Sequence, residues 1–133
     1  MIKLFIGAKG SGKTKTLIEM VNNAATTSSG SVVCIEKGDK LRFDITSKAR
    51  LIDTDYYGVN NAVKLTGFIA GILASNSDIT DVFVDSALKI CGEDVAAFET
   101  LLTDVEKLAS DVNVVMTVSI AVDVCPDSIK AYT

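Results

Sequence analysis

The sequence predicts an α/β fold, with a mostly parallel sheet and helices on both faces. Three observations lead to this prediction. Short apolar segments typical of strands alternate along the chain with longer segments in which apolar residues recur at helical spacing. A glycine-rich loop joins the first strand-like segment to the first helix-like segment. The length of 133 residues, of which 48% are hydrophobic, suits one domain with its own core, expected to span residues 1–133.

The N-terminal segment predicts a strand, a loop and a helix in that order. Residues 2–6 are apolar apart from one lysine and predict a short strand, and residues 7–14 form the glycine-rich loop. Apolar residues then recur at the spacing of one helix face: Leu17, Met20, Val21, Ala24 and Ala25. The small polar residues 26–30 are expected to end this helix.

A small β-hairpin is expected near residues 31–45. Residues 31–36 predict a second strand, and residues 37–40 predict a turn. Apolar and polar residues alternate over residues 41–45, which is typical of a half-exposed hairpin strand. Residues 49–53 predict a further strand.

Two amphipathic helices and two strands account for most of the remaining chain. We expect helices at residues 60–74 and 93–109 and buried strands at residues 79–85 and 112–118. The tail around Pro126 predicts one turn of helix, because proline is favoured at the first helical position. Two glycines four residues apart predict close packing of the first of these helices on the sheet: Gly67 and Gly71.

The glycine-rich loop carries the motif G-x-x-x-x-G-K-[ST], which is the phosphate-binding P-loop. Its glycines let consecutive backbone N–H groups turn towards a phosphate, and the following helix adds the positive end of its dipole. Lys13 is expected to bridge the β- and γ-phosphates, and the Thr14 hydroxyl to ligate Mg²⁺. A nucleoside triphosphate is therefore expected to bind at nine consecutive residues: Gly7, Ala8, Lys9, Gly10, Ser11, Gly12, Lys13, Thr14 and Lys15.

Through this loop the chain resembles the P-loop NTPase superfamily. The resemblance implies the three-layer P-loop NTPase fold and the cofactors ATP and Mg²⁺. The apolar residues 79–84 followed by Asp85 look like the second motif of that superfamily, whose carboxylate holds a water on Mg²⁺. The distance between the two motifs is similar to that in the branch in which another strand separates the two motif strands. The alternative is that Asp85 only ends a buried strand.

The sequence indicates the residues for hydrolysis less clearly than those for phosphate binding. Ser86 occupies the position at which the resembling branch usually has a water-orienting glutamate. Glu36, at the end of the second strand, is the best substitute, because parallel strands bring their carboxyl ends to one edge; the alternative is an ordinary strand-end charge. In the resembling branch a polar residue at the end of the last strand senses the γ-phosphate, and Ser119, or Thr117 two residues earlier, stands there; the alternative is a hydroxyl satisfied by its neighbours.

A second class of function is a small-molecule kinase. Asp53 and Asp55 follow a predicted strand and look like the substrate-side acids of kinases built on this fold. Asp53 would accept the substrate proton, and Asp55 or Arg50 would hold the substrate. The arginines argue against a kinase, since only Arg42 and Arg50 are present and kinases of this fold take lid arginines from the C-terminal half.

A third class is a nucleotide switch, which changes its affinity for a partner and hydrolyses slowly. The missing glutamate and the missing lid favour this class. A protein partner or a second copy of the chain would then complete the site, with Arg42 or Arg50 acting in trans, although both are more simply surface residues. ATP is expected rather than GTP, because no Asn-Lys-x-Asp motif is present.

The whole chain is also similar to small stand-alone bacterial ATP-binding proteins, some of which are labelled twitching-motility ATPases. Residues 35–38 and 51–55 carry this similarity. It implies ATP binding without a settled activity, because motility motors are far longer and have histidine-containing motifs that this chain lacks.

Composition disfavours several other classes. A net charge of −4 leaves little basic surface for nucleic acid, and no run of about 18 uncharged apolar residues predicts a membrane span. The sequence begins directly with the first strand, so we expect no signal or transit peptide. Three cysteines without zinc-binding spacing are typical of a reducing cytoplasm: Cys34, Cys91 and Cys125.

Overall fold

The computed structural model describes residues 1–133, which form five strands interspersed with helices. The strands are β1 (Ile2–Gly7), β2 (Ser31–Glu36), β3 (Arg50–Asp53), β4 (Ile79–Val84) and β5 (Asn113–Ser119). The helices are α1 (Lys13–Thr27), α2 (Ala62–Ser75), α3 (Ala87–Ile90), α4 (Val95–Leu108) and α5 (Asp127–Lys130), with a short 3-10 turn, η1 (Val122–Val124). The predicted α/β fold class is confirmed.

The five strands form one parallel sheet in the order β1-β5-β4-β2-β3. β5 lies between β1, which leads into the glycine-rich loop, and β4, which leads into Asp85. A strand between the two motif strands is what the resemblance to the P-loop branch implied. Because all the strands are parallel, their carboxyl ends meet at one edge of the sheet, where ligands of such sheets bind.

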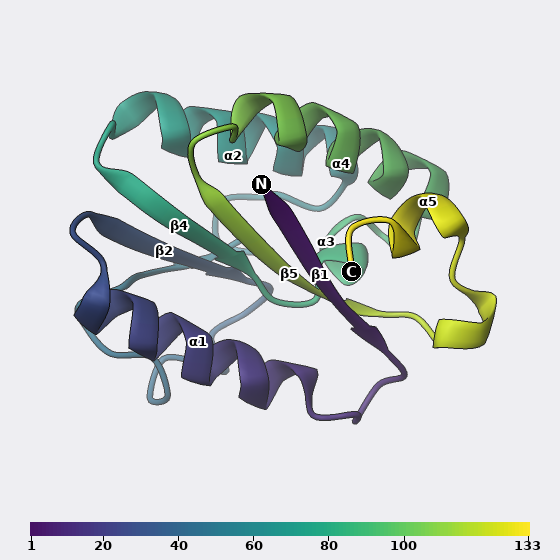
Figure 1. Ribbon diagram of the computed structural model, residues 1–133, viewed down its shortest axis with the longest axis horizontal. Helices are drawn as coiled ribbons and strands as arrows, with labels where there is room; N and C mark the ends of the chain where they lie inside the picture. The colour runs from purple at the N-terminus through teal and green to yellow at the C-terminus, as the bar shows by residue number, and fades with distance from the viewer.

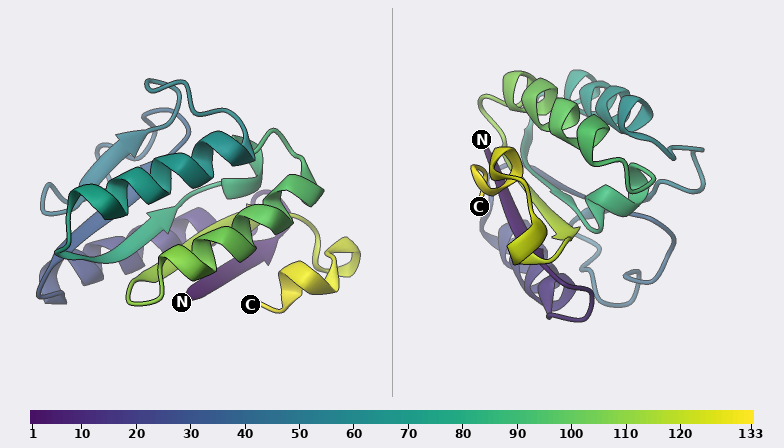
Figure 2. Two further views of the ribbon diagram at one scale, coloured as in Figure 1. Left: turned by 90° about the horizontal axis from the view of Figure 1, so that it is seen from above. Right: turned by 90° about the vertical axis from the view of Figure 1, so that its right-hand side faces the viewer.

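Helices cover both faces of this sheet, which gives the expected three layers (Figure 1). α2 and α4 lie side by side on one face, and α1 lies on the other (Figure 2). Successive side chains of a strand supply the two cores in turn. In β4, Val82 and Val84 join the larger apolar cluster under α2 and α4, whereas Phe83 joins the smaller cluster against α1.

The two long helices on the larger core begin at side chains that cap them. Asn61 accepts a hydrogen bond from Lys64 N at 2.9 Å at the start of α2. Asp94 accepts one from Ala97 N at 3.0 Å at the start of α4. Both predicted helices are confirmed to within two residues at each end.

The expected role of Gly67 and Gly71 is wrong. Both glycines lie on the exposed face of α2, and a Cβ added at either would meet no atom within 4 Å. The face of α2 that packs on the core consists instead of Ala62, Leu65 and Ile69.

No helix of the protein combines the length and the apolar character that a bilayer crossing requires.

The predicted β-hairpin is absent, and residues 37–49 form turns instead. The N–H groups of Asp44 and Ile45 bond to the carbonyl of Leu41 at 2.9 and 3.0 Å. This turn places Leu41 and Ile45 in the core against α1 and leaves Phe43 86% exposed. The alternating pattern misled the prediction because residues four apart share one face of a helical turn as well as one face of a strand.

Candidate functional site

A pocket of about 580 Å³ lies where the carboxyl ends of β4 and β5 meet the loop that precedes α1. Only two of its fourteen lining residues are hydrophobic, so it suits a polar or charged ligand. The lining residues are Lys9, Gly10, Gly12, Lys13, Thr14, Lys15, Lys40, Leu41, Asp85, Ser86, Leu88, Lys89, Glu93 and Ser119. The fold therefore gathers most of the predicted phosphate loop, Asp85 and Ser119 around one space.

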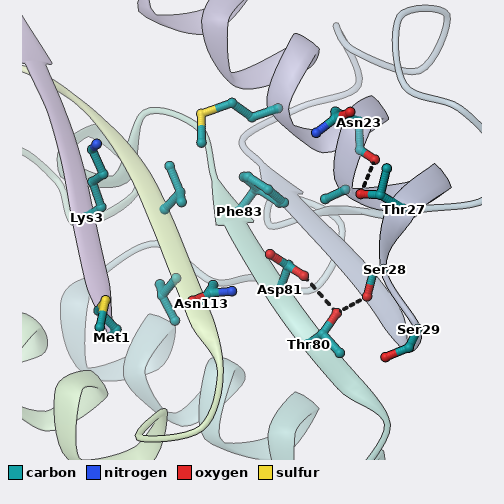
Figure 3. A pocket seen from close by; sticks show the side chains of 14 residues that line it. Met1, Lys3, Asn23, Thr27, Ser28, Ser29, Thr80, Asp81, Phe83 and Asn113 are labelled. Atoms are coloured by element: carbon teal, nitrogen blue, oxygen red, sulfur yellow. Dashed lines mark hydrogen bonds between the residues drawn. The ribbon is translucent and has the colours of Figure 1, made fainter.

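A second pocket of about 580 Å³ lies near the end of α1, at the amino-terminal edge of the sheet (Figure 3). Three of its polar side chains are paired with one another. Thr80 hydrogen-bonds with Ser28 and also donates to Asp81 at 2.7 Å (Figure 3). None of the predicted site residues lines this pocket, so it has no part in the predicted chemistry.

The loop between β1 and α1 depends on glycines with left-handed backbone angles. Gly10 has a φ of 85° and Gly12 a φ of 88°. A Cβ at either position would meet no atom within 4 Å, so there is room for a side chain. Glycine is favoured at both positions because of the positive φ angle. At Gly7 the close approach matters instead, because a Cβ there would lie 2.8 Å from the Ser11 hydroxyl oxygen.

The N-terminus of α1 has no side-chain partner of its own. No side chain caps this fifteen-residue helix, and its first turn contains no acidic residue. The first N–H groups of a helix have no acceptor within the helix, and they carry the positive end of its dipole. Because Lys13, Thr14 and Lys15 of this turn line the pocket, these groups suit an anion bound there.

The Lys13 side chain folds back onto the glycine-rich loop. Its ammonium group donates to the carbonyl of Ala8 at 2.9 Å and to the hydroxyl of Ser11 at 3.3 Å. Burial lowers the pKa of Lys13 from its ordinary value, and the nearby Asp85 carboxylate opposes that shift. The ammonium group is thus held beside the backbone N–H groups, where it can meet the same anion.

Asp85 joins the two predicted motifs. Its Oδ1 atom accepts a hydrogen bond from the Thr14 hydroxyl at 3.0 Å and another from the Thr117 hydroxyl at 2.7 Å. Thr117 is only 1% exposed, and its oxygen in turn accepts the N–H of Ser86 at 2.8 Å. These bonds hold the carboxylate at the lining of the pocket, beside the start of α1.

The oxygens of Thr14 and Asp85 are of the type that Mg²⁺ takes as ligands. Mg²⁺ usually takes one or two protein oxygens and completes its shell with water and substrate phosphates. No group of three or more His, Cys, Asp or Glu side chains is placed to hold a metal by itself. A cation at Thr14 and Asp85 would therefore depend on phosphate and water for its remaining ligands.

The structure separates the two candidates at the end of β5. Ser119 is exposed and lines the pocket. Thr117 is buried, lies outside the pocket lining and bonds to Asp85, so it positions that carboxylate and cannot itself touch a ligand. Ser119 is thus the member of the pair that lines the pocket.

The expectation for Glu36 is not supported by its surroundings. Glu36 is 2% exposed and does not line the pocket. Its two carboxylate oxygens accept the backbone N–H groups of Lys40 and Leu41, each at 3.1 Å. Burial raises the pKa of Glu36, and Asp85 and Asp53 add to that shift while the two backbone bonds oppose it. Its carboxylate fastens the loop after β2, and its burial away from the pocket keeps it from orienting a water there.

The acids of the kinase hypothesis lie outside the pocket. Asp53 Oδ1 accepts the N–H groups of Gly38 and Asp55, at 2.7 and 2.8 Å. Asp55 forms an ion pair of 2.7 Å with Lys37. Both acids therefore connect the loops after β2 and β3. These structural contacts account for the two acids without a role in binding a substrate.

The arginines also lie outside the pocket. Arg50 begins β3, so it is at the opposite end of that strand from Asp53 and cannot hold a substrate beside Asp53 and Asp55. Arg42 stacks on the ring of Phe43 at 4.7 Å and lies 3.9 Å from Asp39. Neither arginine supplies charge to the pocket of its own chain.

Sequence reasoning missed three charged residues of the pocket: Lys40, Lys89 and Glu93. Lys40 follows β2, and the other two follow β4, so all three are charged residues downstream of strands that end at this edge. A charged residue downstream of a strand that ends at this edge could have been noted from the sequence. Only the observed paths of the loops, however, bring the three residues to one pocket. Glu93 also has a φ of 62°, which is uncommon for a residue other than glycine.

No protein-family model and no curated protein matches this chain. The geometry of the pocket is therefore the basis for a proposal about its function.

Proposed function

We propose that this chain binds ATP with Mg²⁺ in the pocket at the start of α1 and acts as a slow or partner-activated ATPase or as a nucleotide switch. The single observation that carries the proposal is the hydrogen bond between Thr14 and Asp85 at the uncapped end of α1. It brings together the two predicted motifs, one for phosphate and one for metal, that are far apart in the sequence.

The phosphate-binding part rests on backbone and lysine donors. The loop N–H groups and the helix dipole would hold the β-phosphate, and Lys13 would move from Ala8 and Ser11 to the phosphate oxygens. Thr14 would ligate Mg²⁺ directly, and Asp85 would hold one of its waters. When bound, Mg²⁺ would neutralise charge on the β- and γ-phosphates.

Slow turnover is supported by the two positions that were expected to orient water, Ser86 and Glu36. Ser86 follows Asp85, and the Glu36 carboxylate is occupied by two backbone N–H groups. Glu93 is the only acid besides Asp85 that lines the pocket. A protein partner or a second copy of the chain would then supply what fast hydrolysis needs.

The choice of adenine rests on the absence of the guanine motif from the sequence. The cytoplasm is the proposed location, because all three cysteines are free and buried and a reducing compartment keeps them so. The net charge of −4 disfavours nucleic acid as a partner.

Calorimetric titration with ATP and with GTP, each with and without Mg²⁺, tests the proposal, and the same samples are assayed for released phosphate. We expect Mg²⁺-dependent ATP binding in the micromolar range and turnover of well under one per second, below the usual range of enzymes. A protein that binds neither nucleotide under these conditions would contradict the proposal.

A further inference from the structure

The pocket has more positive charge than the P-loop motif accounts for. Five lysines line it, although the whole chain has a net charge of −4. Three of them belong to the glycine-rich loop and the start of α1. The other two, Lys40 and Lys89, come from separate segments of the chain.

The loop that delivers Lys40 is fastened at several points. The Glu36 carboxylate accepts the N–H of Lys40 at 3.1 Å, as described above. The side chain of Asn22, on α1, donates to the carbonyl of Asp44 and accepts the N–H of Thr46, both at 2.9 Å. Leu41 is also buried in the core, so the loop packs against α1. The position of Lys40 at the pocket is therefore built into the fold.

The place of Lys40 in the sheet indicates which end of the ligand it meets. Lys40 follows β2, and β2 pairs directly with β4, which leads into Asp85. On the other side of β4, β5 and then β1 lead into Ser119 and the glycine-rich loop. Lys40 therefore lies on the β2 side of Asp85, away from the glycine-rich loop. In the proposed site this is the end at which Mg²⁺ would bind.

We propose that Lys40 contacts the terminal phosphate of the bound nucleotide and makes the pocket selective for a triphosphate over a diphosphate. This inference rests on the proposed ATP site. A cation that touches only the γ-phosphate stabilises ATP and has no partner in ADP. Because no arginine lines the pocket, lysines supply its positive charge, and Lys40 is the one of them that follows β2, on the far side of Asp85 from the glycine-rich loop.

The loop supplies a matched control for Lys40. Lys48 is also exposed, lies on the same loop and has the same charge, but it does not line the pocket. Replacing Lys40 with Ala leaves the backbone N–H that Glu36 binds, so we expect the thermal unfolding midpoint to stay unchanged. Lys40→Arg keeps a cation at the site and serves as the conservative variant.

The experiment is equilibrium binding of ATP and of ADP, each with Mg²⁺, to the wild type, Lys40→Ala, Lys40→Arg and Lys48→Ala. We expect Lys40→Ala to weaken ATP binding on the order of tenfold and ADP binding less than about twofold. Lys40→Arg should keep most of the preference for ATP, and Lys48→Ala should bind both nucleotides as the wild type does.

Two other results would overturn the inference, and they differ from a failure of the ATP site. If Lys40→Ala lost ATP and ADP affinity equally, or lost neither, Lys40 would have no special contact with the terminal phosphate while the ATP site would stand. If the wild type bound neither nucleotide, the proposed function would fall, and the inference with it.

Discussion

The Thr14 hydroxyl donates a hydrogen bond of 3.0 Å to Asp85, although 71 residues separate the two in the chain. A second hydroxyl, from Thr117, donates to the same carboxylate oxygen at 2.7 Å. The contact exists because β5 alone separates β1 from β4, so that the loop after β1 and the residue after β4 share one edge of the sheet. Substitutions at this contact and around it test the proposed site.

Lys13→Ala should remove most of the affinity for ATP, at least about tenfold, because charge-assisted hydrogen bonds to phosphate are lost. The fold should persist, since the Lys13 ammonium bonds only within its own loop. Calorimetric titration measures the affinity, circular dichroism checks the fold, and Lys48→Ala is the control for loss of one positive charge. ATP binding of undiminished strength in Lys13→Ala would remove Lys13 from the site.

Asp85→Asn should weaken ATP binding with Mg²⁺ more than ATP binding in the presence of a chelator. The amide removes the negative charge that favours the cation and keeps the size of the side chain. Asp111→Asn, at an exposed position outside the pocket, controls for the change in net charge. Equal losses with and without Mg²⁺ would show that Asp85 is only structural.

Thr117→Val should lower the free energy of unfolding by about 1–3 kcal/mol, because the half-buried N–H of Ser86 loses its acceptor. It should also weaken the Mg²⁺ dependence of ATP binding, since Asp85 loses a donor. Thr117→Ser keeps the hydroxyl and should retain the Mg²⁺ dependence at a smaller stability cost of about 1 kcal/mol for the lost methyl group. Urea unfolding and titration with Mg²⁺ measure the two effects, and a Thr117→Val protein with wild-type behaviour in both would refute the positioning role.

Glu36 should make stability depend on pH. Its pKa in the folded protein is raised above the ordinary value of 4.5, chiefly by burial, so the folded state holds this proton more tightly than the unfolded state does. The stability linked to this proton is complete below about pH 4.5 and is lost as the pH rises through the folded pKa. The difference in unfolding free energy between the wild type and Glu36→Gln should therefore fall over that window, with Glu19→Gln on the exposed side of α1 as control. A difference that grows with pH would contradict this reading of Glu36.

The three cysteines should resist thiol reagents in the folded protein. All are buried, and burial raises the pKa of Cys34 and of Cys91 to about 12 and raises that of Cys125 as well. Because the thiolate is the reactive form, labelling at pH 8 should be slow for the native chain and should reach all three thiols in urea. Fast labelling of one thiol in the native chain would show that its segment opens.

The sequence predicted what depends on local pattern and missed what depends on loop paths. Apolar periodicity was sufficient for the strands and the long helices, the P-loop motif indicated Thr14, and the resemblance of residues 79–85 to a second motif indicated Asp85. The hairpin prediction failed because Leu41 and Ile45 share a face in a turn as they do in a strand. Glu36 and Lys40 could not be assigned in advance, because their roles depend on the loop after β2 folding back onto a buried carboxylate.

The most direct test of the central claim is a titration of the ¹⁵N-labelled chain with ATP and Mg²⁺, followed by the amide resonances of each residue. The proposal predicts the largest changes at Gly10, Gly12, Lys13 and Thr14, with further changes at Asp85 and little change in the pocket of Figure 3 at Asn113. Unchanged loop amides at millimolar ATP, or changes confined to the pocket around Asn113, would contradict the assignment of an ATP site to the start of α1.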